Sequence, residues 1–376
     1  MSGIPIKNKN LFRKLAKYLV FSFYGLFIAV LLMEVTLRLM QGIFFEAPDY
    51  LKTDAELGTT LRASFHQTVG IGEMRDEIHH NSLGLRGPEV RKDPAALRIF
   101  LVGDSYTYGW GTSDSGTVSA QLQKLLNRKG IDAEVLNLGV GGYSTAQSYL
   151  RFKRFARLKP DLVVYLFCSN DPDDNRKFLG GEYHPSYPET YRTWWRVFLR
   201  RYSLTFQTLL YKRMNLSDYP VTEFGYIDSQ DYRDLTDVYP DDSASVLMKE
   251  TLVYTDSIAQ LADSVNAGFM IGFTNVCIFD SDSVGLTPVS QYYADKFGSK
   301  GFKLILPDVE FKNAFKHSLK NIRGDVPFMG HYNANGYRLW ALNIYKDVLK
   351  YLQDKQDGAA SGSASARLHE KHILSR

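Results

Sequence analysis

The stretch RIFLVGDSYTYG, residues 98–109, decides the fold of this chain. Residues 98–103 form a short apolar run that ends in glycine, which is typical of a buried strand. Ser105 follows at the point where such a strand would turn into a helix. A serine in this turn presents its hydroxyl at the carboxyl edge of a sheet, beside the free N–H groups of a helix start. The stretch therefore predicts a strand and a helix that together expose Ser105.

The alternation of strand and helix continues on the C-terminal side of this stretch. The spacing of apolar residues predicts further strands at 133–138, 162–167, 268–276 and 302–306, and helices at 118–126, 144–158, 246–262 and 336–352. Strands separated by helices imply an α/β fold with a parallel sheet that helices flank. Ligands of such sheets bind at the carboxyl ends of the strands.

Three further motifs lie at a predicted strand end or helix start. They are NLGVGGYST at 137–145, CSND at 168–171 and HYNANGY at 331–337. The glycines of the first motif suit the close approach of a ligand, including a phosphate. However, no G-K-[ST] follows, and the spacing is not G-x-G-x-x-G. Taken alone, the Asn–Asp pair of the second motif indicates only a turn.

Taken together and in this order, the four motifs resemble those of the SGNH (GDSL-type) serine hydrolases, in their membrane-anchored bacterial envelope form. The segment NSLGLRG at 81–87 resembles the lead-in of such members. The resemblance implies a flavodoxin-like three-layer sandwich, with Ser105 as nucleophile and His331 as base. It also implies an oxyanion hole made by the backbone N–H groups of Ser105 and Gly142 and the amide of Asn170. Cys168 stands where the family usually has glycine, and no cofactor is implied.

The group that would orient His331 departs from the family pattern. The family usually has an aspartate two or three residues before the histidine, where this chain has Met329 and Phe328. A partner histidine normally needs an acceptor on its second ring nitrogen. The candidates are Asp325, a backbone carbonyl near Phe328, and Asp308, and the absence of any orienting group is the remaining alternative.

An uncharged run, YLVFSFYGLFIAVLLM at 18–33, follows a basic N-terminus. It predicts a transmembrane anchor at 18–40, a cytoplasmic basic tail at 1–17 and a single-pass protein of the inner membrane. The excess of basic residues before the run places the following chain in the periplasm. A cleaved signal peptide and a buried helix are the alternatives, although no small-x-small cleavage motif follows the run.

The remaining segments complete the predicted organisation. Residues 41–95 are irregular in pattern and predict an extended lead-in to a hydrolase-like domain at 96–353. Residues 172–245 interrupt the alternation and predict an inserted subdomain, and residues 354–376 predict a disordered tail. Tyr191, Trp194 and Trp195 in the insertion are candidates for stacking on substrate, with packing of the subdomain as the alternative.

Composition argues against several other classes of function. The net charge of +4 comes largely from the basic N-terminus, so there is no electrostatic case for nucleic acid. Two cysteines, Cys168 and Cys277, make no disulfide framework, and whether they pair is open. The histidines lack ligand spacing, and the adjacent His79 and His80 would point apart on a strand. The sequence therefore predicts no metal site.

These observations favour an extracytoplasmic serine esterase. An active site near a bilayer favours the removal of acyl groups, acetyl above all, from cell-envelope or exported glycans, with lipid esters as the other substrate class. Three alternatives remain open. The first is an O-acyltransferase that uses the same residues, the second is a non-catalytic glycan-binding or assembly protein on this fold, and the third is a structural membrane protein.

Overall fold

The computed structural model describes residues 9–39, 50–71, 74–93, 95, 97–181, 203, 205, 243–273, 276–279, 283–317 and 331–373. The chain divides into two compact units. The larger unit comprises Tyr50–Gln67, Asp76–Tyr187 and Val221–Arg376, and the smaller comprises Met1–Asp49, Thr68–Arg75 and Pro188–Pro220. The predicted insertion at 172–245 lies mostly outside the described residues.

The larger unit is built on a five-stranded sheet in which every strand is parallel to its neighbours. Its strands are β5 (Leu97–Gly103), β6 (Ala133–Asn137), β7 (Leu162–Phe167), β8 (Gly268–Phe273) and β11 (Lys303–Ile305), in the order β11-β8-β7-β5-β6. Counted along the chain, this is the flavodoxin-like order 2-1-3-4-5, which confirms the predicted fold class. The order reverses between β5 and β7.

The central strand β7 is buried along its whole length, since all six of its residues, LVVYLF, are buried. All five residues of the edge strand β6 are buried as well. A continuous apolar run can be buried in this way only in a sheet that is covered on both faces. The predicted strand at 268–276 is divided in the structure. β8 ends at Phe273, and β9 (Val276–Phe279) pairs with β10 (Ser283–Leu286) in a separate hairpin.

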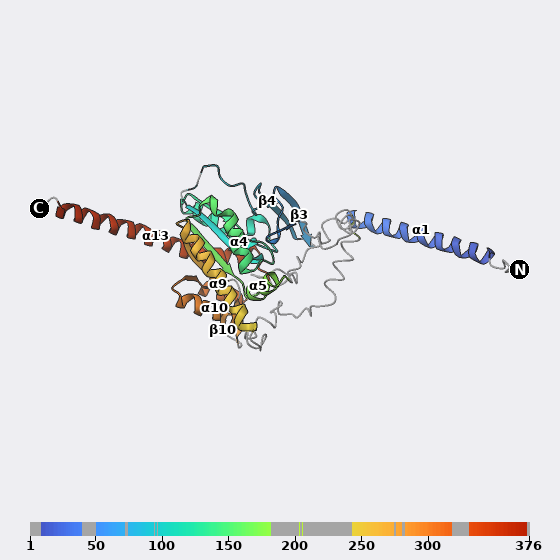
Figure 1. The fold of residues 1–376 in the computed structure, drawn as a ribbon. Helices are drawn as coiled ribbons and strands as arrows, with labels where there is room; N and C mark the ends of the chain where they lie inside the picture. Colours follow the sequence, from blue (N-terminus) through green and yellow to red (C-terminus); the bar gives the residue numbers. More distant parts are fainter. Residues whose placement is uncertain are drawn as a thin grey trace. The chain divides into compact units, whose positions relative to one another are not determined.

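Helices flank this sheet (Figure 1). They are α3 (Val118–Arg128), α4 (Thr145–Phe155), α5 (Asp171–Leu179), α9 (Ser243–Ser264), α10 (Pro288–Ser299), α11 (Val309–His317) and α13 (Ala334–Ile373). α3 packs against α13, while α4, α5 and α9 pack against one another. α13 continues to Ile373, so the structure makes most of the predicted disordered tail helical.

The predicted lead-in at 41–95 is more regular than its pattern suggested. It contains β1 (Leu51–Asp54) paired with β2 (Gly58–Leu61), and β3 (Phe65–Ile71) paired with β4 (Met74–His80). Arg86 forms a further antiparallel bridge to Asn137 at the end of β6. The described part of this segment therefore contains two pairs of strands.

A buried arginine ties this lead-in to the sheet. Arg151 on α4 donates from Nε to the Leu138 carbonyl at 2.8 Å, from Nη1 to Thr60 Oγ1 at 3.0 Å and from Nη2 to the Gly84 carbonyl at 2.8 Å. Burial of a guanidinium is tolerable only where its N–H groups find acceptors. Since two of these acceptors belong to the lead-in, the parts of the lead-in around Thr60 and Gly84 pack against α4 in the larger unit.

The smaller unit contains α1 (Lys9–Leu39). Within α1, Arg13–Leu37 is the one stretch of the described residues that is long and apolar enough to cross a membrane. Its apolar side chains from residue 15 to residue 35 are largely exposed, for example 73% for Phe21, whereas Leu37 is buried. Glu34 interrupts the apolar surface and accepts hydrogen bonds from Ser203 Oγ and the Thr205 N–H, both at 3.0 Å. By length and composition the helix fits a membrane span or a signal sequence.

Candidate active site

The turn after β5 holds Ser105 in a fixed position. Ser105 begins the short helix α2 (Ser105–Tyr108), and the carboxylate of Asp104 caps this helix by accepting the Tyr106 N–H at 2.9 Å. Gly109 ends α2 in a left-handed conformation, with φ of 87°, and its N–H donates to the Ser105 carbonyl. Both ends of the turn are therefore hydrogen-bonded, and Ser105 lies at the carboxyl edge of the sheet.

His331 reaches this serine from the other end of the chain. Its Nε2 lies 2.7 Å from Ser105 Oγ, although 226 residues separate the two in sequence. The ring of Tyr106 stacks on the His331 imidazole, with centroids 4.6 Å apart. Asn333 caps α13 by accepting the N–H groups of Asn335 and Gly336, which fixes the segment that carries the histidine. The Nε2–Oγ distance is suited to direct proton transfer.

The glycine-rich segment after β6 lies against α2. A Cβ at Gly139 would come within 2.2 Å of the Tyr108 nitrogen, so only glycine allows this approach. Gly142 has φ of 74°, a conformation that favours glycine. A Cβ at Gly141 would lie 3.9 Å from the Cβ of Ser105. The segment therefore brings the backbone next to the serine, where the sequence predicts an oxyanion donor.

Asn170 stands at the end of the neighbouring strand. β5 and β7 are adjacent in the sheet, so Ser105 and Asn170 follow strand ends on either side of the point where the strand order reverses. Asn170 occupies the N-cap position of α5 without a capping bond from its side chain, and its Nδ2 donates to Asp174 Oδ2 at 2.6 Å. An amide nitrogen carries two N–H groups, so this bond leaves a second one for another acceptor.

Two buried carboxyl groups lie behind these motifs, and sequence reasoning missed them as a pair. Burial raises the pKa of Asp104 to about 6, against the opposing effect of its bond from the Tyr106 N–H. Burial, followed by the charge of Asp104, raises the pKa of Asp171 well above its ordinary value. Asp171 Oδ2 accepts the Tyr165 hydroxyl and the Cys168 N–H. In the sequence Asp104 is next to Ser105, and Asp171 is next to Asn170. This adjacency to predicted site residues is the signal by which the two carboxyl groups could have been found.

The raised pKa of Asp104 predicts a pH-dependent stability. Below about pH 4 this carboxyl is protonated in both folded and unfolded chains, and its contribution to stability is fully present. That contribution is lost as the pH rises through about 6, the folded-state pKa. Measured by urea denaturation, the unfolding free energy of the wild type should therefore fall relative to that of Asp104→Asn between these two pH values. A difference that stays constant over this range contradicts the prediction.

The other predicted site residues are placed as follows. Asp325, Phe328 and Met329 lie outside the described residues, as do Tyr191, Trp194 and Trp195 of the insertion. Asp308 accepts the Phe311 N–H at 2.8 Å and pairs with Lys346, so its carboxylate is committed to α11 and α13. Cys168 is buried and is not in a disulfide, and the side chain of Cys277 lies outside the described residues.

Comparisons with known proteins come from a family profile and from solved structures. Residues 101–267 match the GDSL-like lipase/acylhydrolase family. No curated protein matches the chain. A G-D-S-L family lipolytic protein from Desulfitobacterium hafniense is 10% identical, over 66% of this chain and 98% of that one, with a TM-score of 0.38. The esterase EstA from Pseudoalteromonas sp. is 10% identical, over 68% of this chain and 98% of that one, with a TM-score of 0.38. A G-D-S-L family protein from Veillonella parvula is 18% identical, over 67% of this chain and 97% of that one, with a TM-score of 0.36.

Proposed function

We propose that this chain, whose residues 101–267 match the GDSL-like lipase/acylhydrolase family, is a serine esterase acting through an acyl-enzyme on Ser105. The observation that carries the proposal is the distance of 2.7 Å between Ser105 Oγ and His331 Nε2. A nucleophile within hydrogen-bonding distance of a base is the arrangement that activates a hydroxyl group for attack.

The proposed reaction has two half-reactions. His331 Nε2 accepts the proton of Ser105 while Oγ attacks the ester carbonyl, and the same proton is then donated to the departing alcohol oxygen. Water attacks the acyl-enzyme with His331 again as base, and the carboxylic acid leaves as Ser105 regains its proton. The atoms balance without a metal or cofactor.

The negative charge on the carbonyl oxygen needs hydrogen-bond donors in each half-reaction. The proposed donors are the backbone N–H groups of Ser105 and Gly142 and the amide of Asn170. Three features support this assignment: the fixed turn at Ser105, the left-handed backbone of Gly142, and the position of Asn170 at the next strand end. The role of Asp174 in this proposal is to hold the Asn170 side chain through the 2.6 Å bond.

The proposed substrate is an acyl ester, above all an acetyl ester, on a cell-envelope or exported glycan. The support is indirect and comes from the apolar helix Arg13–Leu37, which suits an anchor in the inner membrane. Five basic residues precede residue 18 in the sequence, which favours a cytoplasmic N-terminus and a periplasmic hydrolase domain. Tyr191, Trp194 and Trp195 are the proposed residues for stacking on sugar.

A fluorophosphonate probe tests the proposed function on the full chain in detergent. We expect labelling of Ser105 in the wild type, none in Ser105→Ala, and normal labelling in Ser115→Ala, which removes an exposed hydroxyl of the same protein. Acetate release from an acetylated glycan in water would identify a hydrolase, and acetyl transfer to an added glycan an O-acyltransferase. An intact fold with no labelling of Ser105 contradicts the proposal.

Reporter fusions test the proposed topology. Alkaline phosphatase fused after residue 376 should be active, because it folds only outside the cytoplasm, and the fusion protein should stay in the membrane at full length. A shortened N-terminus would indicate a cleaved signal peptide instead. Activity of a cytoplasmic reporter at the same position contradicts the topology.

A further inference from the structure

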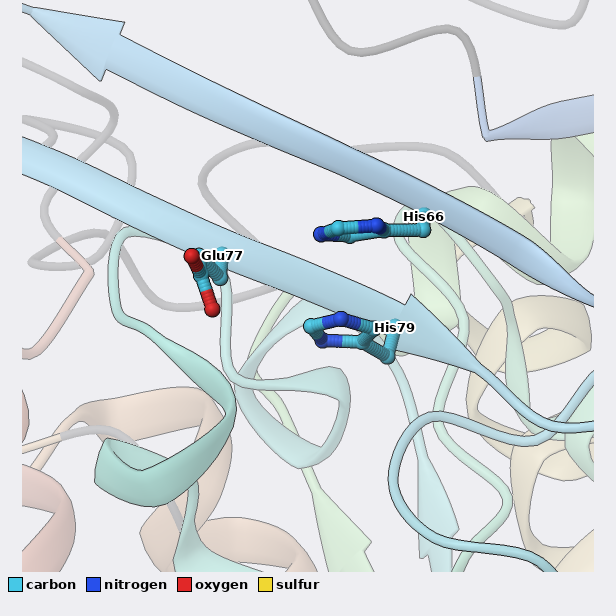
Figure 2. A group of neighbouring side chains, drawn as sticks. All are labelled: His66, Glu77 and His79. Atoms are coloured by element: carbon cyan, nitrogen blue, oxygen red, sulfur yellow. The ribbon is translucent and has the colours of Figure 1, made fainter.

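Two histidines and a glutamate meet on the hairpin of β3 and β4, in the part of the larger unit that precedes the sheet. Glu77 and His79 are two residues apart on β4, so their side chains leave the same face of the strand. His66 comes from the paired strand β3. Figure 2 shows the two imidazole rings lying parallel, with Glu77 beside them. The esterase chemistry proposed for Ser105 uses none of these residues.

We propose that His66, Glu77 and His79 bind a divalent transition-metal ion, with Zn²⁺ as the ion that the ligand set favours. Two imidazoles and one carboxylate are typical ligands of zinc, whereas calcium and magnesium prefer oxygen ligands throughout. Three protein ligands leave a fourth position of a tetrahedral ion open to water or to another ligand.

The distances within the cluster are close to those that an ion requires. One ligand atom from each residue lies within 4.8 Å of the other two, and the two imidazole centroids are 4.0 Å apart. Bonds of about 2.0–2.2 Å around a tetrahedral zinc place ligand atoms about 3.3 Å from one another. His66 and Glu77 are exposed and His79 is half-buried. Binding therefore requires the exposed side chains of His66 and Glu77 to turn toward the His79 ring, because the lone pairs of two parallel imidazoles lie in separate planes.

A second observation concerns the other ring nitrogen of His79. Its Nδ1 lies 2.7 Å from Asp114 Oδ2, and its backbone N–H donates to the same oxygen at 2.9 Å. The other oxygen of Asp114 accepts the Nε–H of Arg86 at 2.9 Å, so the carboxylate is held from both sides. A proton on Nδ1 directed at this carboxylate leaves the lone pair of Nε2 for a metal. Carboxylates commonly hold metal-binding histidines in this way.

The same contacts connect the cluster to the helix that carries the nucleophile. Besides Asp114, Arg86 binds the carbonyls of Tyr108 and Gly109, at 3.2 Å and 2.7 Å, and that of Thr112 at 2.6 Å. Tyr108 and Gly109 end α2. An ion on His79 would therefore hold the hairpin in place beside this turn. We infer that the ion stabilises the lead-in and takes no part in ester hydrolysis.

Zinc binding by the full, metal-stripped chain in detergent and without a polyhistidine tag tests this site. Titration calorimetry should give one Zn²⁺ per chain, and the melting temperature should rise on adding zinc. Cobalt in place of zinc should give the visible absorption of a four-coordinate ion. His66→Ala, Glu77→Gln and His79→Ala should each weaken binding by at least about 10-fold, and Asp114→Asn by about 10- to 100-fold with the stoichiometry unchanged.

Two controls separate this site from other zinc-binding residues. Glu310→Gln makes the same change on an exposed glutamate elsewhere. His369→Ala combined with His372→Ala removes two other histidines, which are three residues apart in the sequence. Both variants should bind zinc as the wild type does. A wild type that binds no zinc at micromolar concentration, a His66→Ala variant that binds it unchanged, or loss of binding in the double variant each overturns the proposal. Failure here leaves fluorophosphonate labelling of Ser105 unaffected.

Discussion

Alanine at Ser105 or at His331 should lower kcat for an aryl acetate by roughly 10⁶-fold, the loss known for a serine protease whose nucleophile or base is removed. The reason is the 2.7 Å contact between Oγ and Nε2, since neither residue can form the acyl-enzyme without the other. The double variant should therefore be no slower than either single variant. The measurement is steady-state hydrolysis by the full chain, with melting temperatures as a check on folding.

Ser115→Ala is the matched control, because it removes a serine hydroxyl from an exposed position near the site without touching His331. It should retain the activity of the wild type. Two results would contradict the assignment of nucleophile and base. One is a folded Ser105→Ala variant with substantial turnover, and the other is a double variant much slower than both single variants.

Alanine at Asn170 should lower kcat by about 100- to 1000-fold and change KM little, because an oxyanion donor acts mainly in the transition state. Removal of the amide leaves the backbone donors of Ser105 and Gly142 in place, so the remaining activity should exceed that of Ser105→Ala. Asn170→Asp should be at least as slow, since it places a negative charge where an oxyanion forms.

Asn127→Ala serves as the control for this prediction, because Asn127 is an exposed amide on α3. Asp174→Ala should give an intermediate loss in kcat, because it frees the Asn170 side chain from the bond that holds it. If Asn170→Ala raised KM and left kcat unchanged, the residue would bind the ground-state substrate and not the oxyanion.

The sheet could be predicted from sequence because its signal is local. Residues 162–167 form a continuous apolar run between Pro160 and the CSND motif, and β7 has these bounds in the structure. Burial on both faces requires such a run, so the sequence of the strand carries the information. By contrast, β1 and β2 are only four residues long and take their support from distant residues. The contact between Thr60 and Arg151 joins residues 91 positions apart, and no local pattern reveals it.

In the candidate site, too, some features follow from local sequence patterns and others depend on contacts between distant residues. Ser105 and His331 could be proposed together because each belongs to a motif at an element boundary, although their distance depends on the whole fold. The charge of Asp104 affects the pKa of Asp171 because β5 and β7 are neighbours in the sheet. The composition of the chain does not reveal which strands are neighbours. His66 lies 13 residues from His79, and the hairpin brings them together. Spacing of ligands along the sequence does not reveal that arrangement. The expectation that His79 and His80 point apart agrees with a buried His80 and a half-buried His79.

Arg151 on α4 donates hydrogen bonds to Thr60 and Gly84. Residues 50–93 therefore resemble a peptide ligand that is bound to the hydrolase domain and is also covalently part of the same chain. Because this segment and the hydrolase domain belong to one chain, it is present at an effective concentration that is in the millimolar range for short linkers. Contacts too weak to retain a free peptide are sufficient at that concentration. Cleavage between this segment and the domain would therefore turn an intramolecular equilibrium into a bimolecular one. The fraction of domain with the peptide bound would then depend on dilution. Arg151 would lose two hydrogen-bond acceptors whenever the peptide dissociates.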